Sequence, residues 1–146
     1  MAESGYNWGA WGFVQKSGGG DWDDLAIADD ALPYSAAISL DGKAACIISL
    51  QLVEDNTGAV VANSVTVAIL GDTDGTNYED LPGLAGAQVG CPYKFTITPV
   101  QNDTVFAVFN VDPKYYDNFK VVILNESGQG LVTDVRIKTA TIPPAS

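Results

Sequence analysis

Histidine is absent from the 146 residues of this sequence. Its absence excludes Ser-His-Asp and Cys-His nucleophile arrangements, and it removes the commonest general base and the imidazole ligands of most zinc and copper sites. No other nucleophile stands beside an obvious base. We therefore expect a protein that is not an enzyme, with no catalytic residues and no cofactor.

Basic residues are scarce as well: seven stand against eighteen acidic residues, which gives a net charge of -11. A surface this anionic is repelled by phosphate backbones and by anionic lipid headgroups, so we expect no nucleic-acid and no membrane partner. No apolar run approaches the ~18 residues of a membrane span. The acidic start MAESGYNW lacks the regions of a secretion signal, which favours synthesis in a cytoplasm.

Only two cysteines are present, Cys46 inside an apolar run and Cys91 beside Pro92. Two thiols at this spacing form no disulfide framework. A bridge between them stays possible on the sequence, but in a reducing compartment we favour two free thiols.

A helical pattern of ten or more residues is also missing. Apolar and β-branched runs bounded by turn residues instead predict an all-β fold, an antiparallel jelly roll or related β-sandwich. Asp41-Gly42 predicts a hairpin turn, and Pro99 places the end of its strand at a sheet edge or at a bend. The run 104–111, apolar on nearly both faces, predicts a central strand. The expected strands cover residues 34–40, 43–53, 59–70, 93–100, 104–111, 119–125 and 131–142.

The chain divides into an extended glycine- and tryptophan-rich arm at 1–30, a β-sandwich domain at 31–142 and a short tail at 143–146. Aromatic rings on such an arm need cover, either from the chain's own sandwich or from a partner. We favour a partner, and we then expect removal of residues 1–24 to leave the domain folded. The candidate partner-binding residues are Tyr6, Trp8, Trp11, Phe13 and Trp22.

Two polar segments have a functional and a structural interpretation. GDTDGTNYED carries carboxylates that suit calcium, but Asp, Asn and Gly are also what a tight turn requires, and we favour the turn without a metal. Tyr115 and Tyr116 in DPKYYDN offer a stacking platform for a sugar. We favour a turn in which their rings pack on the end of a sheet.

The order of strands and turns in SLDGKAACIISLQLVEDNTG, ILGDTDGTNYEDLPGLAG and FAVFNVDPKYYDNFKVVILNESGQGLVTDVRIKTA resembles the capsid cement, or decoration, proteins of tailed bacteriophages. The resemblance covers about residues 38–140. It implies a non-enzymatic virion structural protein with a jelly-roll domain, made in the host cytoplasm. Such a protein binds the major capsid protein on the outer surface of the shell, stabilises it, and forms a homo-oligomer, a trimer.

Two alternatives stay open. One is another structural protein of a phage head or tail. The other is a carbohydrate-binding β-sandwich module, with calcium on Asp72 and Asp74 and with the rings of Trp8, Trp11, Trp22, Tyr115 and Tyr116 stacking on sugars.

Overall fold

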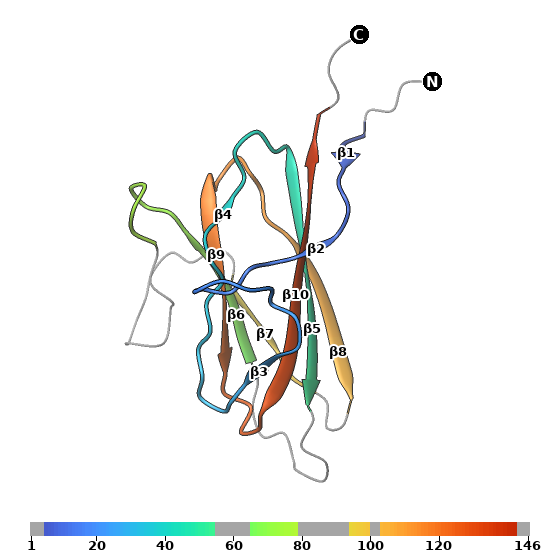
Figure 1. Ribbon diagram of the computed structural model, residues 1–146, viewed down its shortest axis with the longest axis vertical. Coiled ribbons are helices and arrows are strands. Elements are labelled where there is room, and N and C mark those ends of the chain that lie inside the picture. Colours follow the sequence, from blue (N-terminus) through green and yellow to red (C-terminus); the bar gives the residue numbers. More distant parts are fainter. Residues whose placement is uncertain (1–4, 55–64, 79–93, 100–102, 143–146) are drawn as a thin grey trace.

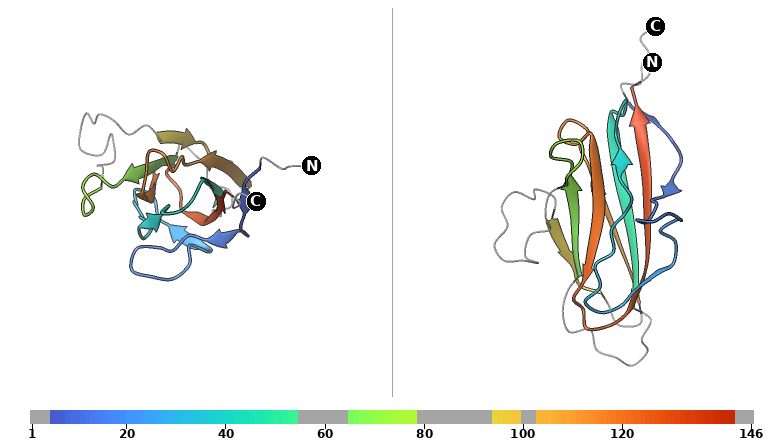
Figure 2. Two further views of the ribbon diagram at one scale, coloured as in Figure 1. Left: turned by 90° about the horizontal axis from the view of Figure 1, so that it is seen from above. Right: turned by 60° about the vertical axis from the view of Figure 1, so that its left-hand side comes forward.

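The computed structural model describes residues 5–54, 65–78, 94–99 and 103–142. In these residues the chain forms ten strands and no helix, and accordingly it contains no helix long and apolar enough to cross a membrane. The strands build two sheets that face each other across a common core (Figures 1 and 2). The predicted all-β class is confirmed.

The order of strands is that of a jelly roll. One sheet runs β3-β10-β5-β8 and the other runs β4-β9-β6-β7, with β1 and β2 also pairing with β10, which is the double-sheet arrangement of eight strands. The bounds are β1 (Asn7–Trp8), β2 (Gly12–Phe13), β3 (Leu25–Ile27), β4 (Ile38–Ser39), β5 (Ala45–Glu54), β6 (Val65–Gly71), β7 (Lys94–Ile97), β8 (Thr104–Asn110), β9 (Asn118–Asn125) and β10 (Leu131–Thr141).

The core lies between the two sheets, where strands contribute every second residue. In β5 the residues from Cys46 to Leu52 alternate between buried and half-buried, as the sequence predicts. They meet the inward residues of β6 and β9, among them Ile69 and Ile123. The period of two in the sequence therefore identifies the inner face of β5 correctly.

The N-terminal arm is part of the six-stranded sheet. Strands β1, β2 and β3 pair one after another with the same edge of β10: Trp8 lies opposite Ala140, Phe13 opposite Arg136. Between β2 and β3 the chain leaves the edge in a turn at 18–20, where three successive glycines have φ between 86° and 100°. Side chains other than glycine rarely adopt such values, so the turn itself requires these glycines.

Trp22 is fully buried in the core of its own chain. Its indole Nε1 donates a hydrogen bond to Thr133 Oγ1 at 2.8 Å, and Val14 and Ile27 join the same hydrophobic cluster. The prediction that Trp22 contacts a partner is wrong, because strand β10 already covers and satisfies its ring. The core thus extends across the predicted boundary at residue 30; the tail at 143–146 lies outside the described residues.

Two further predictions need correction. Asp41-Gly42 does form a turn, with Gly42 at a φ of 71°, but it joins β4 and β5, which belong to different sheets, so it closes no hairpin. Among the strands that the structure describes, β8 lies at a sheet edge and not at the centre. Its outward residues Phe106 and Val108 are 70% and 65% exposed, so apolarity on both faces does not reflect burial on both faces.

Replacing Trp22 by alanine should destabilise the whole domain by about 3–5 kcal/mol, since it leaves a cavity in the core and removes the hydrogen bond from the indole to Thr133 Oγ1. Equilibrium denaturation in urea measures the change. Trp11→Ala is the matched control, because Trp11 is 43% exposed, and it should cost far less. Equal losses for the two variants would contradict the placement of Trp22. Deletion of residues 1–24 also removes Trp22 from the core, so we expect it to destabilise the domain.

Candidate functional site

Four aromatic residues of the arm lie along the outer side of β10, and we call Tyr6, Trp8, Trp11 and Phe13 the aromatic stripe. Tyr6, Trp8 and Trp11 are 50%, 39% and 43% exposed, and Phe13 is half-buried. The rings of Tyr6 and Trp8 meet edge to face, with centroids 6.1 Å apart and planes at 90°. The stripe therefore presents large apolar rings to solvent in a fixed arrangement.

Two cations of β10 hold the stripe in place. The Nζ atom of Lys138 lies 5.0 Å from the ring centroid of Trp8 and 4.9 Å from that of Trp11. The guanidinium carbon of Arg136 lies 4.7 Å from the ring centroid of Phe13. Positions 136 and 138 share one face of the strand. Each contact contributes about 0.5–1 kcal/mol at an exposed site, so this face of β10 fixes the arm and its rings together.

At one end of the stripe the rings border a hollow of about 270 Å³, which we call the Tyr6–Trp8 hollow. The two aromatic rings contribute to one part of its wall, and residues from the end of β8 and the following turn contribute polar groups. Small residues of β5 line it as well. Its lining includes Tyr6, Trp8, Ala45, Asn110, Asp112 and Lys114. A few polar groups in a partly apolar concavity are the usual composition of a small-molecule site.

The turn that borders the hollow is ordered by Asp112. Its Oδ1 accepts a hydrogen bond from the Lys114 backbone N–H at 2.9 Å, and its carbonyl accepts one from the Tyr115 N–H at 3.0 Å. The remaining lone pairs of the carboxylate stay available to a ligand. The hollow therefore offers an anionic acceptor at Asp112 and a cationic donor at Lys114.

The thiol of Cys46 also lines the hollow, but it is buried and free. Desolvation raises the pKa of this thiol to about 12, so it stays protonated at neutral pH and is a poor nucleophile and metal ligand. A bridge from Cys46 to Cys91 cannot be followed, since Cys91 lies outside the described residues.

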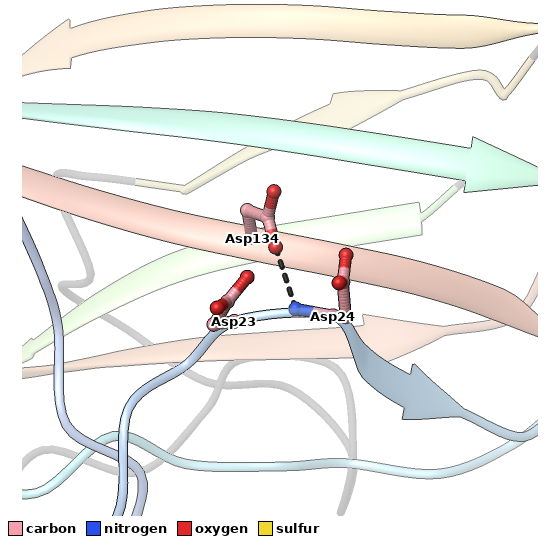
Figure 3. Close-up of side chains that lie close together, drawn as sticks. All are labelled: Asp23, Asp24 and Asp134. Atoms are coloured by element: carbon pink, nitrogen blue, oxygen red, sulfur yellow. Dashed lines mark hydrogen bonds between the residues drawn. The ribbon is translucent and has the colours of Figure 1, made fainter.

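Three carboxylates, Asp23, Asp24 and Asp134, gather beside β10 (Figure 3). Atoms of Asp23, Asp24 and Asp134 all lie within 4.8 Å of one another. Asp134 Oδ1 accepts a hydrogen bond from the Asp24 backbone N–H at 2.6 Å, and its Oδ2 lies 3.6 Å from Arg136 Nη2. Carboxylate oxygens are ligands for a hard cation such as Ca²⁺, but here Asp134 already accepts a hydrogen bond from the Asp24 amide and pairs with Arg136.

This cluster disfavours the charged form of Asp23. Desolvation raises the pKa of its carboxyl above 3.8, and the negative charges of Asp24 and Asp134 raise it further. Arg136 lowers it, with a smaller effect. In the folded protein Asp23 therefore keeps a proton to higher pH than it does in the unfolded chain.

The predicted turn at GDTDGTNYED uses its carboxylates locally. Asp72 Oδ1 accepts from the Asp74 N–H at 3.0 Å, and Asp74 Oδ1 accepts from the N–H groups of Thr76 and Asn77 at 2.9 and 2.7 Å. The hydrogen bonds from Asn77 and from the Thr76 N–H lower the pKa of Asp74. The bonds to Asp72 and Asp74 account for both aspartates as turn residues, while residues 79 and 80 lie outside the described residues.

The two tyrosines of DPKYYDN separate. Tyr116 is buried in the core, whereas Tyr115 is 76% exposed. A two-ring sugar platform at this turn is therefore wrong, because only Tyr115 has a ring that solvent can reach. The favoured prediction that both rings pack is correct for Tyr116 and wrong for Tyr115.

No protein-family model matches this chain, and no curated protein is similar to it in sequence. Solved structures of similar shape include one described as "CBM4 structure and function", with 15% identity, a TM-score of 0.44, and coverage of 82% of this chain and 70% of the other. At such scores the likeness carries no argument about function.

Two further structures are similar at the same level. One is the C-terminal CBM6 of LamC, a marine laminarinase from Zobellia galactanivorans, with 15% identity, a TM-score of 0.39, and coverage of 88% of this chain and 90% of the other. Another is the carbohydrate binding module CBM6cm-2 from Cellvibrio mixtus lichenase 5A in complex with cellotriose, with 13% identity, a TM-score of 0.37, and 88% coverage of each chain.

The structure brings four of the five predicted site residues together and removes Trp22 from them. It adds residues that the sequence analysis does not single out: the cation Lys138, and Asn110, Asp112 and Lys114 on the hollow. The break in the apolar pattern at DPK marks a turn there. No local signal, however, shows that this turn lies beside Tyr6.

Asp23→Asn should raise the melting temperature at pH 7. The folded-state pKa of Asp23 is raised, so its ionised form costs stability above that pKa, and the cost vanishes below the unfolded pKa of 3.8 where both states are protonated. The gain over wild type should therefore disappear near pH 3. Asp21→Asn, the same charge change outside the cluster, corrects for the general effect of lowering a net charge of -11. Equal gains in both variants would contradict a specific cost at Asp23.

Proposed function

We propose that this chain is a non-catalytic binding domain whose Tyr6–Trp8 hollow binds carbohydrate. The observation that carries the proposal is the composition of that hollow: two exposed aromatic rings beside an amide, a carboxylate and an ammonium in about 270 Å³. The sequence leaves a carbohydrate-binding module open as an alternative to a cement protein, but the residues proposed to bind the sugar differ from those predicted. Trp22, Tyr116 and the turn at Asp72 no longer take part.

The chemistry of a sugar ring matches such a surface. One face of a pyranose carries C–H groups with a slight positive charge, which stack on the negative π-face of an aromatic ring. The hydroxyl groups at the rim of the sugar need hydrogen-bond partners. Asn110 can donate and accept, Asp112 accepts, and Lys114 donates. The hollow is near the lower size limit of small-molecule sites, so a short stretch of one or two sugar units fits best.

The positions of the rings are set before any ligand arrives. Lys138 holds Trp8 from β10, and Tyr6 packs edge to face on Trp8. A ligand therefore does not have to order these side chains, which keeps the entropic cost of binding low.

Trp8→Ala should weaken sugar binding at least about tenfold, a loss of roughly 1.4 kcal/mol, because it removes the stacking surface. Titration calorimetry with soluble neutral oligosaccharides, cellotriose among them, measures the affinity. Trp11→Ala is the matched control: it removes an equally exposed indole that contacts the same Lys138 but does not line the hollow. Absence of binding to every sugar tested, or equal losses in both variants, would remove the proposal.

A second candidate is the capsid decoration protein that the sequence resembles. The observation that favours it is that the stripe continues past the hollow to Trp11 and Phe13. Aromatic and arginine side chains dominate the energy of protein interfaces, and a row of them along a sheet offers a broad surface to a protein partner. On this proposal the major capsid protein covers the stripe.

The same pair of variants separates the two candidates. Docking on a shell of the cognate major capsid protein should be weakened by Trp11→Ala as much as by Trp8→Ala, since both rings are then anchors. Co-sedimentation with purified shells gives the bound fraction. A loss confined to Trp8→Ala, or no sedimentation of the wild-type protein with shells, would speak against decoration.

A further inference from the structure

Strand β8 is the least protected edge among the described strands. Proteins usually protect sheet edges by short strands, charged residues or proline. The opposite edge of the same sheet is formed by the short strands β1 to β3, β4 has two residues, and β7 contains Lys94 and is followed by Pro99. Strand β8 instead has seven residues, TVFAVFN, without charge or proline. Figure 1 shows it at the margin of its sheet.

The backbone of β8 has hydrogen-bonding groups to offer on its outer edge. Val111 N–H donates to Cys46 O at 3.0 Å, so by the alternation of an antiparallel ladder residues 105, 107 and 109 point their backbone groups toward β5. The backbone groups of Thr104, Phe106, Val108 and Asn110 then point away from β5. Within the described residues, β8 pairs with no strand other than β5.

The side chains of these edge residues are apolar in the middle. Phe106 and Val108 are 70% and 65% exposed and lie on the outer face of the sheet, next to Gln51 and Ser49 of β5. Large exposed apolar side chains on a free strand edge favour association. A strand added to this edge of β8 would cover the side chains of both Phe106 and Val108.

We infer that the occupant of this edge is a second copy of the same chain, which pairs β8 with β8 in antiparallel orientation about a two-fold axis at Ala107. Along this edge the two outer residues, Thr104 and Asn110, are polar, and the two middle residues are apolar. A two-fold axis at Ala107 places Thr104 opposite Asn110 of the second copy and Phe106 opposite Val108. Polar thus meets polar, apolar meets apolar, and every outward backbone group gains a partner.

Charge supports a second copy as well. The chain has a net charge of -11, so two copies repel each other over most of their surfaces. The strand from Thr104 to Asn110 carries no charged residue, and Ser49 and Gln51 beside it are neutral. Two anionic chains can therefore approach along this strip. Asp103 and Asp112 flank it, so each end brings an acid of one copy near an acid of the other.

The first test is the mass of the full-length protein by sedimentation equilibrium from low micromolar to near-millimolar concentration. A dimer should form, and Val108→Lys should raise its dissociation constant at least about tenfold, because it replaces an apolar contact at the strand edge by an ammonium that would have to lose hydration on pairing. Ile142→Lys is the matched control: Ile142 is 71% exposed and lies outside β8, so this variant should dimerise as the wild type does. Circular dichroism checks that each variant is folded.

Salt gives a second readout. Screening of the repulsion between the two copies, over a Debye length of about 8 Å at physiological ionic strength, should make the dimer tighter as salt rises. A third readout fixes the register. Phe106→Cys combined with Val108→Cys should give a disulfide-linked dimer on oxidation, whereas Thr104→Cys combined with Val108→Cys should not, since these positions do not face each other.

A strict monomer at the highest concentration overturns the inference. A trimer, or a dimer that Val108→Lys leaves intact, overturns it too, because another surface would then hold the copies together. In the absence of sugar, Trp8→Ala should leave the dimer unchanged, so the test of the dimer and the test of sugar binding at the Tyr6–Trp8 hollow can fail separately.

Discussion

The edge of β10 that does not face β5 needs a hydrogen-bonding partner, and the N-terminal arm supplies it. Three short strands of the arm pair in turn along this edge, and between them the chain inserts Trp22 into the core. The same pairing aligns the aromatic stripe with Arg136 and Lys138. The stability of the sandwich and the position of its exposed rings therefore depend on one ladder.

A buried polar network fixes the arm at its other end. Asn125 Nδ2 donates to the carbonyl oxygens of Ile27, Ala28 and Gln129 at 3.1, 3.2 and 2.7 Å. Its Oδ1 accepts from the hydroxyl of Ser127 at 2.6 Å. Because each buried donor and acceptor would be costly to leave unpaired, this network holds the end of β3 against the turn before β10. The register of the arm along β10 is thus specified at both of its ends.

Local patterns in the sequence predict which residues face the core, but not which strands are neighbours. The alternation in β5 is correct because a period of two reflects burial on one face. The central position predicted for β8 is wrong because exposed Phe106 and Val108 produce the same pattern as buried residues. Asp41-Gly42 is correct as a turn and wrong as a hairpin, because strand pairing is decided by long-range contacts. The Tyr6–Trp8 hollow joins residues of the N-terminal arm with residues 44–47 and 110–114, which no local pattern relates.

Asn110 connects the two surfaces that the structure presents. Its side chain lines the hollow, and its backbone lies at the end of the outer edge of β8. In the inferred dimer, Thr104 of the second copy lies opposite Asn110, so that the second copy approaches the hollow. A ligand that engages the Asn110 amide then changes the free energy of association, and association changes the affinity of the ligand by the same factor. One residue shared by a pocket and a strand edge can in this way couple binding to assembly.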